Sequence, residues 1–178
     1  RRGALFLDRD GVLIEDVHFL RTPEAIRILP GVVETLRALQ ERYPLVVVTN
    51  QSGIARGFFS EGDLLRIHES LLERFRDAGV FLDAIYYCPH LPEGRVAAYA
   101  VRCACRKPRP GLLLRAMETW GIDPAASLMI GDSPRDVAAG HAAGVKSILF
   151  APASEKLPGT LHTLSRFEDL LPLVEGEP

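Results

Sequence analysis

The chain has 178 residues, 47% of them apolar, and its formal net charge is −2. This length suits a single domain with one hydrophobic core, residues 1–178, and is too short for two ordinary domains. Without a run of Lys and Arg, the chain lacks the broad basic face that nucleic acid or an anionic membrane requires, so a small molecule is the expected partner. No apolar stretch reaches about 20 residues, which argues against a membrane span and against a signal peptide.

Apolar runs of strand length recur along the chain, and each is continuous rather than alternating. Continuous runs indicate strands that are buried on both faces, as in a parallel sheet. The runs occupy residues 4–7, 45–48, 84–87, 127–130 and 147–150.

Helical patterns separate these runs. Ser60 is a possible N-cap of the second pattern, and Ser165 to Glu168 is a capping-box signature before a short last helix. Residues 151–160 are predicted to form a surface loop. Strands that alternate with helices predict a three-layer α/β fold with a doubly wound, mostly parallel sheet. The helical patterns cover residues 32–41, 61–76, 111–120 and 135–143.

Polar residues directly follow several of the apolar runs, where ligands of a parallel sheet gather. Asp8 and Asp10 follow the first run, a hydroxyl and amide cluster at residues 49–52 follows the second, and Asp132 follows the fourth. Two carboxylates this close repel each other unless a cation or a shared proton intervenes, and hard oxygen ligands suit Mg²⁺. Any one of these aspartates could equally belong to an ordinary turn at a strand end. Together they favour a metal and phosphate site.

All three cysteines of the chain lie close to one histidine. Three thiols and one imidazole match the closed tetrahedral sites of structural zinc, which leave no open position for catalysis. Each cysteine alone could be a small buried hydrophobic residue, and the histidine a surface or core residue. As a group they favour zinc and a reducing, cytoplasmic compartment. The four predicted ligands, in a zinc loop at residues 88–105, are Cys88, His90, Cys103 and Cys105.

Sequence motifs add a family resemblance to this chemistry. LDRDGVL at residues 7–13, VVTNQSG at 47–53, CRKPRPG at 105–111 and MIGDSPRD at 129–136 resemble the ordered motifs of the haloacid dehalogenase (HAD) superfamily. Because dehalogenating members lack the second aspartate of the first motif, Asp10, the resemblance favours the phosphatases. It implies a HAD-type phosphoric monoester hydrolase without a large cap domain, for which we expect a monomer.

The resemblance also implies residue roles. Asp8 would be the nucleophile that forms an aspartyl-phosphate, and Asp10 the general acid and base. Thr49 and Lys107 would stabilise the phosphoryl group. Mg²⁺ would be held by Asp8, the backbone carbonyl of Asp10, and Asp132.

Asp136 stands four residues after Asp132 in the last motif. It is expected behind the site, near Lys107 or the metal. A first-turn helix carboxylate, stabilised by the helix dipole, is the alternative.

The zinc loop is similar to that of the superfamily branch that contains heptose-bisphosphate and histidinol-phosphate phosphatases. Its length between His90 and Cys103 is closer to the heptose enzymes, although Arg109 stands where those commonly have histidine. The implied substrate is a small phosphorylated sugar, a heptose 1,7-bisphosphate that loses its C7 phosphate in nucleotide-activated heptose biosynthesis. Histidinol phosphate or another sugar phosphate is the alternative, and a catalytically silent zinc-stabilised binding module is the alternative from another class.

The same resemblance implies contacts to the substrate. Arg106 is the candidate for the second, non-transferred phosphate, since its guanidinium fork suits bidentate binding of an oxyanion. For residues 16–19, an ordinary polar loop is the alternative. The implied substrate-binding residues are Asp16, Val17, His18, Phe19, Thr49, Asn50, Gln51, Ser52, Arg106 and Lys107.

Overall fold

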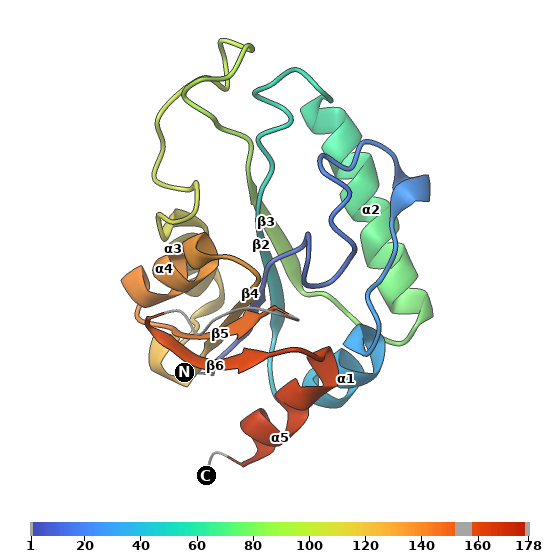
Figure 1. The fold of residues 1–178 in the computed structure, drawn as a ribbon, viewed down its shortest axis with the longest axis vertical. Coiled ribbons are helices and arrows are strands. Elements are labelled where there is room, and N and C mark those ends of the chain that lie inside the picture. The colour runs from blue at the N-terminus through green and yellow to red at the C-terminus, as the bar shows by residue number, and fades with distance from the viewer. Residues whose placement is uncertain (1, 152–157, 177–178) are drawn as a thin grey trace.

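A computed structural model describes residues 2–151 and 158–176 (Figure 1). The strands of these residues form one parallel sheet in the order β3-β2-β1-β4-β5-β6. The chain begins at the centre of the sheet, builds outward to β3, and returns to add strands on the other side. This is the predicted doubly wound arrangement. The strands are β1 (Leu5–Leu7), β2 (Leu45–Asn50), β3 (Ala84–Cys88), β4 (Leu128–Gly131), β5 (Lys146–Phe150) and β6 (Thr160–Leu164).

Helices cover both faces of the sheet. Figure 1 shows α1 and α2 on one side of it and α3 and α4 on the other. Successive residues of a strand point to opposite faces, so Val47 of β2 packs with the core beneath α1 and α2, whereas Val46 and Val48 pack with the core beneath α3 and α4. The predicted three layers are confirmed. The helices are α1 (Val32–Leu39), α2 (Glu61–Asp77), α3 (Gly111–Trp120), α4 (Pro134–Ala142) and α5 (Leu170–Glu175).

Two segments extend beyond the carboxyl ends of the strands, at residues 8–31 and 89–110. Neither contains an α-helix or a strand, so the described residues include no large cap. The second segment is the long loop between β3 and α3 in Figure 1. It rests on the loop after β2, where the amide of Val96 donates to the carbonyl oxygen of Ala55 at 2.9 Å.

Of the two helix starts that capping residues predicted, one is confirmed and one is wrong. Ser60 caps α2 as expected, and it forms a full capping box with Asp63. The capping box predicted at Ser165 is wrong, because the chain there begins with a 3₁₀ turn, Phe167–Asp169, whose N-cap is Arg166. Glu168 pairs with the Arg166 side chain instead.

The outer strands differ from the sequence-based expectation. β6 was not predicted. The surface loop predicted at residues 151–160, of which 152–157 lie outside the described residues, ends at Thr160, where β6 begins. The sequence of β6, TLHTL, has only two apolar residues, so it lacks the continuous apolar run that marked the inner strands. β3 was predicted to be buried on both faces, yet within it only Cys88 is fully buried, because β3 is an edge strand. No helix among the described residues is long and apolar enough to cross a membrane.

Candidate active site

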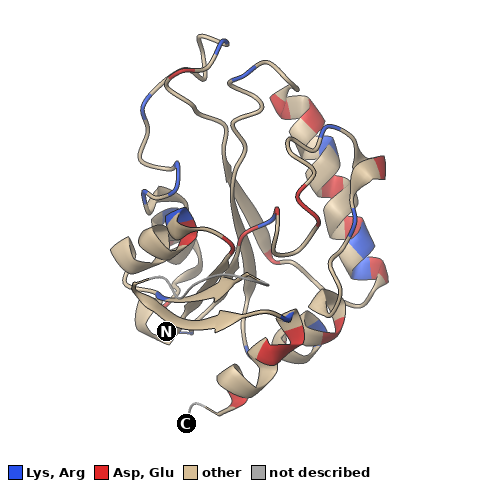
Figure 2. Cartoon of the chain, viewed as in Figure 1, with Lys and Arg blue, Asp and Glu red and all other residues tan. Residues whose placement is uncertain are grey.

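A cavity of about 280 Å³ lies at the carboxyl ends of the central strands. Parallel pairing of β1 with β4 places Leu7 beside Ile130, so the residues that follow each strand meet at one edge. Figure 2 shows acidic and basic residues close together where the chain leaves β1. Asp8, Asp10 and Asp132 all line the cavity, as the sequence predicted.

Lys107 is buried at this cavity, with 2% of its surface exposed. Its Nζ donates to Asp8 Oδ1 at 3.0 Å and to the carbonyl oxygen of Val48 at 2.8 Å, and it lies 2.6 Å from Asp136 Oδ1. Burial alone would lower the pKa of Lys107, but the carboxylates of Asp8 and Asp136 outweigh it and raise that pKa. Lys107 is therefore a protonated ammonium held between two carboxylates.

The backbone of Lys107 is held by Asn50 at the end of β2. The Asn50 side chain accepts from the Lys107 amide at 2.9 Å and donates to the Lys107 carbonyl oxygen at 3.0 Å. One amide side chain thus satisfies both backbone groups of a residue in a long loop. This fixes Lys107 relative to the sheet, although no regular element carries it.

Three carboxyl groups lie close together beside the single ammonium group of Lys107. Asp8, Asp132 and Asp136 can each place an oxygen within 4.8 Å of the others. Burial raises the pKa of Asp8 well above its usual value, and the neighbouring carboxylates add to this. Burial, followed by the charge of Asp136, also raises the pKa of Asp132, to about 6. A carboxylate cluster whose ionised form is this unfavourable is a donor set that fits a hard divalent cation.

Asp136 is committed to other partners within that cluster. Besides Lys107, its Oδ2 accepts from the amide of Asp132 at 3.1 Å, and from the amide and hydroxyl of Ser133 at 3.3 and 3.1 Å. Burial would raise the pKa of Asp136, but Lys107 and the side-chain hydrogen bonds from Ser133 and Asp8 lower it. Asp8 and Asp132 are therefore the carboxylates left to face a cation, and Asp136 holds Lys107 and the start of α4.

The hydroxyl and amide cluster at residues 49–52, which begins within β2, is only partly exposed to the cavity. Asn50, Gln51 and Ser52 line it, whereas Thr49 does not. Thr49 is 1% exposed, and its hydroxyl accepts from Gln51 Nε2 at 2.8 Å. The same Nε2 donates to Asp10 Oδ2 at 3.0 Å, so Gln51 lies between Thr49 and Asp10.

Three arginines line the same cavity, and only Arg106 was predicted. Arg56 and Arg135 also line it. Burial lowers the pKa of Arg106, and the positive charges of Arg135 and Arg56 lower it further. Such mutual repulsion indicates a site for an anion. Arg135 follows the fourth apolar run by a few residues, so its position at the sheet edge was available from the sequence.

The predicted substrate loop at residues 16–19 reaches the cavity through Asp16, His18 and Phe19, but not through Val17. His18 and Phe19 have left-handed φ angles of 53° and 63°, which are unfavourable for residues other than glycine. The Asp16 carboxylate accepts from the His18 amide at 2.9 Å.

Phe19 is supported from the loop after β2. Its ring meets the ring of Phe58 edge-on at 4.9 Å, and the Arg56 guanidinium lies over it at 5.3 Å. These contacts hold the left-handed backbone of the substrate loop in place.

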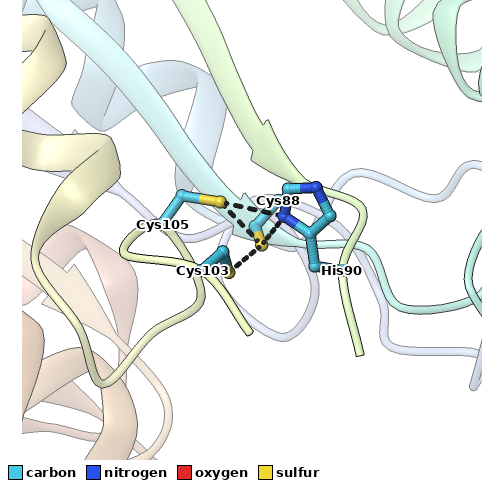
Figure 3. Close-up of side chains that lie close together, drawn as sticks. All are labelled: Cys88, His90, Cys103 and Cys105. Atoms are coloured by element: carbon cyan, nitrogen blue, oxygen red, sulfur yellow. Dashed lines mark hydrogen bonds between the residues drawn. The ribbon is translucent and has the colours of Figure 1, made fainter. Parts of the chain in front are cut away.

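The four predicted zinc ligands converge at the end of β3 (Figure 3). Cys88 Sγ lies 3.6 Å from Cys103 Sγ and 3.6 Å from His90 Nδ1, and Cys105 Sγ lies 3.4 Å from the same nitrogen. Around tetrahedral zinc, bond lengths of about 2.3 Å to sulfur and 2.0–2.1 Å to nitrogen require separations of roughly 3.6–3.8 Å. The distance between Cys88 and Cys105 sulfurs, 2.9 Å, is shorter than this and too long for a disulfide. The cluster is compatible with zinc.

Strand register places this cluster beside the cavity. Cys88 pairs with Asn50 across β3 and β2, and Asn50 holds Lys107, two residues after Cys105. Arg109 donates to the carbonyl oxygen of Cys103, and Arg106 Nη1 lies 3.5 Å from the carbonyl oxygen of His90. The sulfur cluster and the cationic side of the cavity therefore share one short segment of backbone.

Comparisons with known proteins agree with this geometry. The HAD-hydrolase-like family model matches residues 104–156. A D-glycero-beta-D-manno-heptose-1,7-bisphosphate 7-phosphatase from Pasteurella multocida is 40% identical over 181 residues, with 98% of each chain covered. The protein of the same name from Escherichia coli is 45% identical over 143 residues, which cover 80% of this chain and 75% of that one.

A solved structure adds the same likeness in three dimensions. D,D-heptose 1,7-bisphosphate phosphatase from B. bronchiseptica, complexed with magnesium and phosphate, has a TM-score of 0.84 and 31% identity, with 99% of each chain covered. These relatives confirm the predicted superfamily and its phosphatase chemistry, and they argue against a catalytically silent binding module. The chain belongs to the family of the D-glycero-beta-D-manno-heptose-1,7-bisphosphate 7-phosphatases, within the HAD-like hydrolases.

Proposed function

We propose that this protein hydrolyses the C7 phosphate of D-glycero-β-D-manno-heptose 1,7-bisphosphate through an aspartyl-phosphate on Asp8. The observation that carries the proposal is the contact of buried Lys107 with Asp8 in the arginine-lined cavity. An ammonium ion beside a carboxylate nucleophile lets both approach a phosphate dianion. The relatives of more than 40% identity bear this activity in their names.

Asp8 and Asp10, the two aspartates after β1, have separate roles in this reaction. A carboxylate oxygen of Asp8 attacks phosphorus, the bond from phosphorus to the C7 oxygen breaks, and Asp10 gives its proton to that oxygen. Water then attacks the phosphorus of the aspartyl-phosphate and transfers a proton to Asp10. The bond to Asp8 breaks, inorganic phosphate leaves, and both side chains return to their starting states.

Two metal ions complete the proposal. Asp8, Asp132 and the backbone carbonyl of Asp10 would hold Mg²⁺, which when bound offsets the repulsion between the carboxylate and the phosphate. Zinc would bind Cys88, His90 and the other two cysteines as a structural ion, because four protein ligands leave it no open position. Its role would be to hold the segment that carries Arg106 and Lys107.

The three arginines of the cavity suit a substrate that carries two phosphates. While one phosphate faces Asp8, the other needs a second cationic site, and Arg106 with Arg56 and Arg135 supplies it in the same cavity. Histidinol phosphate has only one phosphate, so it leaves this second cluster of positive charge without a partner. The geometry therefore favours the bisphosphate over histidinol phosphate.

Release of inorganic phosphate tests the proposal. Wild-type protein with Mg²⁺ should act fastest on the β-anomer of the heptose 1,7-bisphosphate, more slowly on the α-anomer, and least on histidinol phosphate. Asp8→Asn should abolish release while its circular dichroism and melting temperature stay near those of the wild type. Preference for histidinol phosphate would refute the substrate, and substantial turnover by Asp8→Asn would refute the nucleophile.

A further inference from the structure

Arg9, between the two aspartates of the first motif, is among the most deeply buried large side chains of the described residues. It is 1% exposed. A buried guanidinium is strongly unfavourable unless its charge and its hydrogen-bond donors are satisfied. The partners of Arg9 therefore show what the surrounding structure fixes in place.

Most of these partners belong to Asp10. Arg9 Nε lies 3.1 Å from Asp10 Oδ1, and Nη2 lies 2.9 Å from both Oδ1 and Oδ2. Gln51 Nε2 is a third donor to this carboxylate, at Oδ2. A planar fork against a planar carboxylate fixes the rotation and the tilt of that carboxylate.

The remaining guanidinium nitrogen of Arg9 meets His68 of α2. Nη1 lies 3.1 Å from His68 Nε2, and because an arginine only donates, this ring nitrogen must accept. Burial, together with the charge of Arg9, lowers the pKa of His68 to about 3, which keeps the ring neutral and able to accept. The His68 ring is itself packed edge-on against Tyr87 at 6.0 Å, and the Tyr87 hydroxyl donates to Glu61.

We propose that Arg9 is a positioning residue for the general acid and base Asp10, and that His68 holds Arg9 in the required orientation. The proposal rests on the function proposed above. Asp10 must present one carboxyl oxygen to the leaving oxygen and then to water, although it lies in a loop just after β1. The fork of Arg9 sets the plane of that carboxyl group, and His68 stops the fork from rotating. α2 thereby supports a reaction that none of its own residues contacts.

Leaving-group dependence separates this role from a merely structural one. An alkyl phosphate such as the heptose substrate needs Asp10 to protonate its leaving oxygen, whereas p-nitrophenyl phosphate releases a phenolate that is stable without a proton. Displacement of Asp10 should therefore slow the alkyl substrate selectively. A misplacement of about 1 Å costs up to about 100-fold in rate.

The test compares Arg9→Lys, which keeps the charge but loses the fork, with His68→Leu, which removes the acceptor. Each should lower kcat on the heptose bisphosphate by about 10- to 100-fold, with little change in KM. Release of p-nitrophenolate in the first turnover should change far less. His68→Gln, which restores an acceptor oxygen, should recover most of the lost kcat. Arg66→Lys, at an exposed ion pair on the same helix, is the matched control and should behave as the wild type.

Equal losses on both substrates in both variants would refute positioning and indicate a general packing role. Full activity of both variants would also overturn the proposal. If Arg9→Lys fails to fold, the comparison of His68→Leu with His68→Gln decides alone. Failure of the proposed function itself is distinguishable, because wild-type protein would then release no phosphate from the heptose bisphosphate, whatever the variants do.

Discussion

Substitution of Lys107 by methionine is the sharpest single perturbation of the site. Methionine has a similar length but no charge, so Asp8 and Asp136 would lose the buried ammonium that lies 3.0 and 2.6 Å from them. Removal of one partner of a buried ion pair costs about 3–5 kcal/mol of stability. At about 2–4 °C per kcal/mol for a chain of this size, the melting temperature should fall by about 6–20 °C.

The stability loss of Lys107→Met should depend on pH. In the wild type, Lys107 keeps the pKa of Asp136 below its ordinary value of 3.8, so this pair stabilises the fold above about pH 4. In the variant, the pKa of Asp136 should rise above 3.8, and its ionised form becomes destabilising. The difference between the two proteins should therefore be largest near pH 7 and should narrow as the pH falls toward 4, and it should disappear only below the lowered pKa of Asp136.

The assay is thermal unfolding of both proteins from pH 4 to pH 7, without Mg²⁺, together with phosphate release at pH 7. Loss of one preorganised cationic donor should lower kcat by about 10²- to 10³-fold. Arg115→Met, which removes an exposed cation from α3, is the control and should melt as the wild type does. A melting temperature of Lys107→Met within about 2 °C of the wild type at pH 7 would refute the reasoning, as would a deficit that is the same at pH 4.

Three further predictions concern the metals and the substrate loop. Without Mg²⁺, the wild type should lose stability as the pH rises from about 4 to about 6. The raised pKa of Asp132 lets the folded state retain a proton that the unfolded chain loses in this range. Mg²⁺ should remove this dependence on pH, and a stability that does not change with pH in the absence of Mg²⁺ would contradict the prediction. Cys103→Ser should lower both the melting temperature and the zinc content, which elemental analysis should place near one per chain in the wild type; an unchanged zinc content would exclude Cys103 as a ligand. Phe58→Ala should raise KM about 2- to 12-fold, which corresponds to the 0.5–1.5 kcal/mol of an aromatic pair, and should leave kcat nearly unchanged. A fall in kcat alone would contradict this prediction and show that Phe58 acts on the chemical step.

The carboxylate side of the site was predictable because its signals are local. An apolar run followed by Asp8, or by Gly131 and Asp132, marks the end of a buried strand, and parallel pairing brings such ends to one edge. Cys88 and Asn50 illustrate the same reasoning, since each ends a strand and the two pair in register. Where the functional residue follows a buried strand, local sequence and topology together suffice.

The remainder depends on contacts between distant residues. Arg9 has the sequence of an exposed turn residue, yet it is buried, and one of its partners, His68, lies in the distant helix α2. Thr49 does not line the cavity, and its contact with the side chain of Gln51 is of the same kind. Neither arrangement has a periodicity or a spacing that reveals it, because each depends on which side chain fills a particular space.

Because the described residues include no large cap, loops around the cavity must select the substrate, and these loops restrain one another. The substrate loop contacts the loop after β2 through the rings of Phe19 and Phe58. The loop after β2 also accepts a hydrogen bond, at the carbonyl oxygen of Ala55, from the amide of Val96 in the zinc loop. The loop after β2 thus contacts both of the others, the substrate loop through Phe58 and the zinc loop through Ala55. We therefore expect a zinc ion at Cys88 to support the substrate loop as well as Lys107, since it would hold the zinc loop that contacts the loop after β2.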